Sequence, residues 1–96
     1  MGSGRTAFDL QGSDLKGLRI PFSRWRGANF SDTVLRHADC HGADLAQADF
    51  SRSDLTAANF RDADLRGANV RGAILSRTLT DGRLPDQDLG SGSDGG

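Results

Sequence analysis

Apolar side chains recur at every fifth position along most of the chain. The fourteen positions of this series are Leu10, Leu15, Ile20, Trp25, Phe30, Leu35, Cys40, Leu45, Phe50, Leu55, Phe60, Leu65, Val70 and Leu75. An amphipathic helix needs apolar residues about 3.6 positions apart, and a half-buried strand needs them two apart. A period of five fits neither, so it predicts a chain that turns a corner every five residues and points one large side chain inward at each.

Two more positions of the five-residue unit have a preferred residue type. The residue two places before the apolar one is mostly small, as in Ser13, Ala28 and Ala43. The residue directly before it is usually Asp or Asn, as in Asp44 and Asn59. Asp and Asn side chains bond nearby backbone groups in turns, so we expect them to stabilise the corners.

This unit resembles the repeat of the pentapeptide-repeat proteins, and its clearest copies read ADLAQ, ADFSR, SDLTA, ANFRD, ADLRG and ANVRG. The resemblance covers about residues 8–77. It implies an all-β fold, a right-handed quadrilateral β-helix solenoid in which four units complete each square coil, giving about three and a half coils. The structural core is then expected to contain Leu10, Leu15, Ile20, Phe30, Leu35, Cys40, Leu45, Phe50, Leu55, Phe60, Leu65, Val70 and Leu75.

The ends of the chain depart from the repeat. We expect residues 1–7 to be a lead-in or cap and residues 90–96, which are rich in Gly and Ser, to be a flexible tail. Between them, Leu79, Leu84 and Leu89 keep the spacing of five but stand one place earlier than the main series. Residues 78–89 are therefore predicted to form a degenerate C-terminal cap, because solenoid ends need covering.

Composition agrees with one small solenoid. Only 35% of the residues are hydrophobic, which suffices when almost all of them line one inner surface. No apolar run approaches the roughly 18 residues of a membrane span, and the start, MGSGRTAF, has no apolar signal core. A lone cysteine fits a reducing compartment. We therefore expect a cytoplasmic protein with no membrane contact.

Chemically reactive side chains do not form a recognisable site. The segment HADCH offers His37, Cys40 and His41, but the repeat points Cys40 inward and both imidazoles outward on neighbouring sides. These three ligands would not converge on a zinc ion. The regularly spaced Asp residues are assigned to corners rather than to acid–base chemistry. We expect no catalytic residue, no metal, no cofactor and no small-molecule substrate, and hence no enzyme.

Binding is the function class that remains. We expect a rigid protein–protein interaction or structural scaffold module, which meets a partner protein or another copy through its coil ends or flat faces. Some pentapeptide-repeat proteins mimic DNA and protect or inhibit DNA gyrase, and this is the alternative. Mimicry requires a strongly acidic surface, whereas residues 8–77 contain nine Asp against ten Arg and Lys. The interleaving of Arg with Asp also argues against direct nucleic-acid binding.

One stretch, LRIPFSRWRG at residues 18–27, keeps the period of five but changes the residue types. Arginine replaces Asp or Asn at Arg19 and Arg24, Phe22 stands at an outward position, and Trp25 is large for the interior. Aromatic residues beside arginine are typical of interaction hot spots. The candidate protein-binding residues are Arg19, Phe22, Arg24, Trp25 and Arg26. The alternative is a first coil made irregular because it lies near an end.

Overall fold

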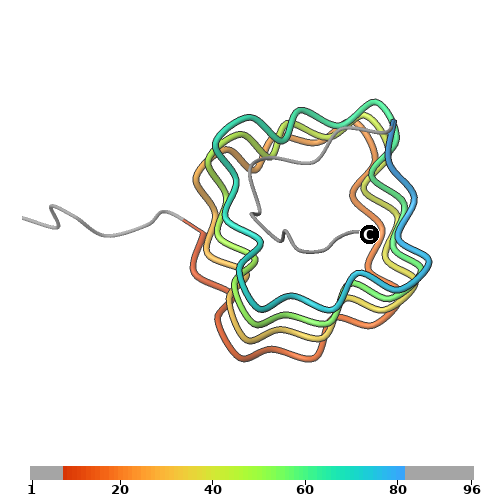
Figure 1. Cartoon of the computed structure of the whole chain (residues 1–96). Coiled ribbons are helices and arrows are strands. Elements are labelled where there is room, and N and C mark those ends of the chain that lie inside the picture. The colour runs from red at the N-terminus through yellow and green to blue at the C-terminus, as the bar shows by residue number, and fades with distance from the viewer. Residues whose placement is uncertain (1–7, 82–96) are drawn as a thin grey trace, which may run out of the picture.

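The backbone of residues 8–81, which the computed structural model describes, is a series of parallel single-residue β-bridges separated by turns. It contains no helix and no extended strand within these residues. Eleven bridges each join a residue to the one twenty positions later, from Asp9–Asn29 to Asn59–Leu79. Four five-residue units therefore complete one coil, and Figure 1 shows the stacked coils as a square when they are viewed along the axis.

The position of each residue is described below by its coil and by its side of the square. The coils are coil 1 (8–27), coil 2 (28–47), coil 3 (48–67) and the incomplete coil 4 (68–81). The sides of the square are named by the inward residue of coil 2, with side A at Phe30, side B at Leu35, side C at Cys40 and side D at Leu45. Because bridged residues are twenty apart, each side lies over the same side of the coil before it.

Each corner has the features of a type II β-turn. At thirteen of the fourteen corners the residue at the small position donates its N–H to the carbonyl of the apolar residue three places earlier, as from Ala43 to Cys40 at 3.0 Å, and at the other corner the Thr33 hydroxyl donates to the Phe30 carbonyl at 2.6 Å. The residue before the small one has a positive φ at every fifth position from 12 to 77. A type II turn requires a positive φ at its third residue. Six of these residues are Gly, and eight others, Phe22 among them, adopt the conformation that glycine favours.

Asp and Asn side chains hold these corners from outside, as predicted. In ten units the side-chain oxygen accepts a hydrogen bond from the backbone N–H two residues later, at 2.9 to 3.2 Å. The ten acceptors are Asp9, Asp14, Asn29, Asp39, Asp44, Asp49, Asp54, Asn59, Asp64 and Asn69. These are all the Asp and Asn residues at this position of the repeat.

Three backbone hydrogen bonds join each side to the same side of the next coil. On side A, the N–H groups of Leu10 and Gly12 in coil 1 donate to the carbonyls of Asn29 and Ser31 in coil 2, at 2.8 and 3.0 Å. In return, the N–H of Asn29 donates to the carbonyl of Phe8 at 2.8 Å. The coil nearer the N-terminus thus donates twice and accepts once, and the pattern recurs on the other sides.

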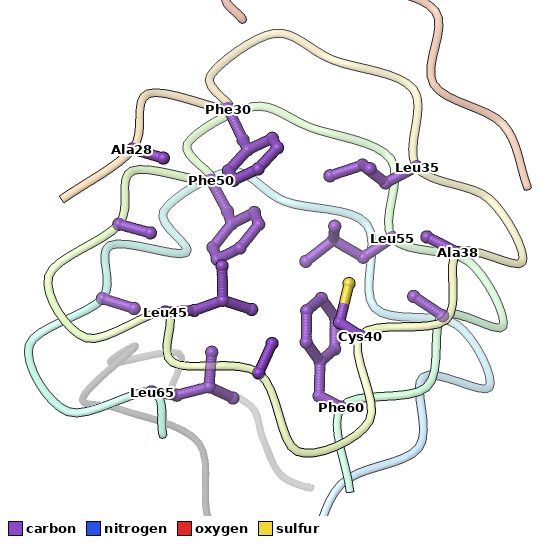
Figure 2. Packing of buried hydrophobic residues seen from close by; sticks show 14 of the residues in the cluster. Ala28, Phe30, Leu35, Ala38, Cys40, Leu45, Phe50, Leu55, Phe60 and Leu65 are labelled. Carbon is purple, nitrogen blue, oxygen red and sulfur yellow. The ribbon is translucent and has the colours of Figure 1, made fainter. Parts of the chain in front are cut away.

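The inward apolar residues form one core along the axis (Figure 2). Ten of the expected core residues are buried, and they are Ile20, Phe30, Leu35, Cys40, Leu45, Phe50, Leu55, Phe60, Leu65 and Val70. The other three, Leu10, Leu15 and Leu75, lie in the outer coils and are partly buried against this cluster. Residues twenty apart stack as the period requires, and the rings of Phe30 and Phe50 lie 5.2 Å apart and nearly parallel.

The end of the repeat differs from the expected boundary at residue 77. Leu79 bridges Asn59, and its carbonyl accepts the N–H of Phe60 at 2.7 Å. It therefore stands at the position of Asp or Asn and is 41% exposed, so the frame does not slip here. The backbone ladder with coil 3 sets the register, and Thr80 takes the next inward position of the series. Residues 1–7, 82–89 and 90–96 of the predicted ends lie outside the described residues.

Asp49→Ala is expected to destabilise the protein, whereas Asp49→Asn should be nearly neutral. Alanine leaves the buried Ser51 backbone N–H without the acceptor that Asp49 provides at 2.9 Å. Losing one such bond costs about 1 kcal/mol, which lowers the melting temperature by roughly 4–8 °C in a domain of this size. Asparagine keeps the oxygen, as Asn29 and Asn69 do on the same side. Thermal unfolding followed by circular dichroism checks both variants, and equal losses would contradict the corner role.

Candidate functional site

The atypical stretch 18–27 remains part of coil 1. Arg19 bridges Asp39 and Arg24 bridges Asp44, so both arginines occupy the usual position of Asp or Asn without breaking the ladder. The corner between them is closed by Ile20 and Ser23, whose backbone hydrogen bond measures 3.4 Å. Proline is favoured at the second position of a type II turn, which is where this corner has its proline. The stretch is therefore a regular corner with an unusual outer surface.

Phe22 is the most exposed of the large apolar side chains in residues 8–81. It occupies the third position of the corner with a φ of 59°, a conformation that is unfavourable for a bulky residue. Its side chain is 72% exposed, so core packing does not compensate for this strain. Seven other non-glycine corner residues have a similar φ, so the exposed ring and not the backbone sets Phe22 apart. Phe22 is thus the clearest candidate for a contact residue.

The next coil provides a seat for the Phe22 ring. A Cβ atom added to Gly42 would lie 2.5 Å from Cδ1 and Cε1 of Phe22, so the ring covers this glycine. The His41 imidazole meets the ring edge-on, with centroids 5.1 Å apart and planes at 88°. The Nε2 atom of His41 lies 3.7 Å from the carboxylate of Asp62 in coil 3. The Phe22 ring therefore packs against Gly42 and His41 on side C.

Three arginines lie in the same coil as Phe22, Arg19 on side C and Arg24 and Arg26 on side D. The Arg19 side chain is 74% exposed, and its guanidinium lies 3.8 Å from Asp39. Arg26 pairs with Asp44 at 3.2 Å, and Arg24 makes no ion pair with any residue of 8–81. Exposed ion pairs of this kind hold their partners weakly, so the guanidinium groups can bind other anions. We call Arg19, Phe22, Arg24 and Arg26 the aromatic–basic surface.

Trp25, the fifth candidate, does not join this surface. It packs against the core in coil 1, with its ring 4.7 Å from Phe8 and 6.0 Å from Phe30. Within residues 8–81, its buried Nε1 has no hydrogen-bond partner. Sequence reasoning missed His41 and Gly42, which support Phe22. The period of twenty residues per coil could have predicted this contact, since Gly42 follows Phe22 by one complete coil.

The HADCH segment is arranged as the repeat predicts. Cys40 points into the core, where burial raises the pKa of its thiol to about 12. His37 and His41 lie on the outer surface of sides B and C. Residues 8–81 hold no group of three or more His, Cys, Asp or Glu side chains placed to bind a metal ion. The same range has no helix that is long and apolar enough to cross a bilayer.

Several surface carboxylates are matched by cations or hydroxyls. The side chain of Arg66 donates two hydrogen bonds to Asp64, at 2.9 and 2.7 Å, and holds the pKa of that carboxyl at about 2. Hydrogen bonds from Arg52 lower the pKa of Asp32, and the Thr56 hydroxyl lowers that of Asp54. These pairings leave the outer surface with alternating charges rather than one acidic field.

Comparison with known proteins identifies the repeat. A family model described as pentapeptide repeats matches residues 22–52 and 38–77, with eight copies. A crystal structure of a pentapeptide repeat protein from the Arabidopsis thaliana thylakoid lumen is 36% identical with a TM-score of 0.72, over 74% of this chain and 50% of that chain. One from Nostoc is 31% identical with a TM-score of 0.62, over 84% of this chain and 69% of that chain. No curated protein matches the sequence.

These likenesses confirm the expected all-β, right-handed four-sided β-helix. The chain spans half the length of the Arabidopsis protein, so the two share the solenoid but not their whole extent. The family model begins at residue 22, so its match includes Phe22, Arg24 and Arg26 and leaves out residues 8–21 of coil 1.

Cys40 is expected to resist alkylation by maleimides at neutral pH in the folded protein. The thiolate is the reactive form, and a buried thiol with a pKa of about 12 forms almost none. Mass spectrometry should find one adduct per chain in denaturant and none within the same time in buffer. Rapid labelling of the native protein would contradict the inward orientation of Cys40.

Acid should destabilise the protein at a pH below the usual range of carboxylates. Since the folded-state pKa values of Asp32, Asp54 and Asp64 are lowered, their stabilising effect is complete well above the ordinary Asp pKa of 3.8 and is lost as pH falls. For Asp64 the loss extends to about pH 2. The melting temperature should therefore stay level down to about pH 5 and fall steeply below about pH 4. Asp64→Asn should fall less steeply, and parallel curves would contradict this assignment.

Proposed function

The chain belongs to the pentapeptide-repeat family, and we propose that it is a non-catalytic module that binds a partner protein through its aromatic–basic surface. The exposed Phe22 ring supports this proposal, because it is the most exposed large apolar side chain of residues 8–81 and lies against Gly42 of the next coil. Neither feature stabilises the core. A ring fixed in place before binding loses little conformational freedom when a partner covers it.

The charges around Phe22 define the chemistry of that partner. Residues 18–27 contain three arginines and no acidic residue, while coil 1 as a whole has four basic and two acidic side chains, a net charge of +2. Arginine and aromatic residues are the commonest hot-spot residues of protein interfaces. The proposed partner therefore presents carboxylates around an apolar side chain that packs on the free face of Phe22.

Nothing observed in residues 8–81 favours catalysis by Cys40 or mimicry of DNA. A nucleophilic role for Cys40 would require a thiolate, and burial keeps this thiol protonated. Mimicry of DNA would require free carboxylates over a broad face. Instead Asp32 and Asp64 are paired with arginines, and the Asp residues of the repeat hold corners.

Peptides selected from a random display library on the immobilised protein provide the test. We expect acidic peptides with an apolar residue, and we expect Phe22→Ala to weaken their binding tenfold or more, as for a hot spot. The matched control is Ile74→Ala, which truncates an exposed apolar side chain, 50% accessible, on side B of coil 4. It should leave the affinity unchanged. Peptides that bind both variants equally well would contradict the proposed surface.

Gly42→Ala tests the seat without removing the ring. The new Cβ would lie 2.5 Å from two ring atoms, so Phe22 must move away from Gly42. Binding should fall nearly as far as in Phe22→Ala. Gly27→Ala is the matched control, because Gly27 has a similar φ, +75° against +69°, and nothing within 4 Å of its Cβ position. Both variants then carry the same backbone strain, and isothermal titration should find weakened peptide binding only for Gly42→Ala.

A further inference from the structure

The described chain ends on the same side of the solenoid as Phe22. Positions twenty apart lie over one another, which places Pro21, His41, Arg61 and Asp81 in one row on side C. The carboxylate of Asp81 accepts the backbone N–H of Asp62 at 2.7 Å, which fixes this end over coil 3. Asp81 therefore lies on the same side as Arg19 and Phe22, three coils away, while Arg24 and Arg26 of the aromatic–basic surface lie on the adjoining side D.

The sequence that follows has the chemistry of the proposed partner. Residues 84–89 read LPDQDL, in which two carboxylates stand between two leucines. Residues 82–96 contain one Arg and three Asp, a net charge of −2, against the net +2 of coil 1. Leucine side chains suit the free face of Phe22, and carboxylates suit the guanidinium groups beside it. Acidic and apolar groups are thus combined in one short segment close to a basic and aromatic surface.

The chain after Asp81 is long enough to span the distance from coil 4 to coil 1. Coil 1 lies three coils from coil 4, and stacked strands are about 4.8 Å apart, so the separation along side C is about 14 Å. An extended chain spans up to about 3.3 Å per residue, so Asp86 reaches about 16 Å from Asp81 and Leu89 reaches about 26 Å. A connection this short gives an effective concentration in the millimolar range, at which even a weak contact is occupied.

We propose that residues 84–89 bind the aromatic–basic surface of their own chain and compete there with an external partner. The regulatory part of this inference rests on the proposed function, since competition has a meaning only if a partner uses that surface. The intramolecular contact itself does not depend on it. The contact also differs from the end cap expected from the sequence, in which residues 78–89 would cover the last coil.

A nitroxide attached at Ser91→Cys distinguishes these arrangements. The native Cys40 is buried with a thiol pKa of about 12, so we expect the label to attach at position 91 alone. In the proposed arrangement the label broadens the amide signals of Phe22, His41 and Gly42 most strongly. Strongest broadening at Val70 and Leu75 would mean an end cap and would overturn the proposal, as would uniform signals.

Matched variants of the labelled protein test the contact from both sides. Asp86→Asn with Asp88→Asn should remove the broadening at Phe22, whereas Asp94→Asn, which removes one charge outside the segment, should not. Arg24→Ala should remove it, whereas Arg71→Ala on side A should not. Since exposed charges are screened within roughly 3 Å at 1 M salt, high salt should also release the segment. Broadening that survives the double variant and high salt would overturn the proposed contact.

The intramolecular contact and the binding of a partner protein are tested by independent experiments. The spin-label experiment needs no partner, so it can succeed even if no peptide is ever selected on the protein. Conversely, selected peptides can depend on Phe22 while the label reports no contact. If both hold, Asp86→Asn with Asp88→Asn should raise the affinity for an external acidic peptide by severalfold. An unchanged affinity would show that the segment does not compete.

Discussion

The corner is the constraint on which the whole molecule depends. Every five residues the chain must turn through a right angle, and the third residue of each turn has a positive φ whether or not it is glycine. Eight corners accept this cost with another residue type, about 1 kcal/mol or more for each. The offset is collective, because hydrogen bonds to the neighbouring coils and an Asp or Asn acceptor support most corners. One side chain from each unit then points inward, which makes a narrow core possible with few apolar residues.

The inward rows and the acceptor role of Asp and Asn could be predicted from the sequence because both follow from its period. The exposed position of Leu79 could not be predicted from the sequence. An apolar residue is expected in the interior, whereas the backbone hydrogen bonds to coil 3 place Leu79 on the outside. Ser31, Ser51 and Thr56 are polar and directly follow the inward residue, yet they are buried, because small side chains at this position are covered by the coils on either side. The packing of Trp25 against Phe8 and the core depends on which way one large ring turns. The repeat period predicts which positions point inward, but it does not predict the side-chain rotamer of Trp25.

The candidate surface was predicted only in part for a related reason. Arg19, Phe22 and Arg24 are visible in the sequence as departures from the repeat, but what distinguishes Phe22 is its contact with residues a full coil away. Gly42 is one of six glycines at equivalent corners and has no distinguishing mark in the sequence. Its role emerges only when the Phe22 ring is placed over it. In a solenoid, the fold places few restrictions on the outward residues. A functional surface therefore combines outward residues from neighbouring coils, which are far apart in the sequence.

The two-to-one pattern of the hydrogen bonds between coils has an electrical consequence. On each side two N–H groups point toward the C-terminal end for every one that points back. Peptide dipoles in ordinary sheets largely cancel, but here a net component remains along the axis. The N-terminal end is the carbonyl-rich, negative pole and the C-terminal end the positive one, the reverse of an α-helix. The basic side chains of coil 1 and the carboxylate of Asp81 stand at the poles of opposite sign. The solenoid thus has a weak permanent dipole along its axis, and its two ends present different electrostatic potentials to any molecule that approaches.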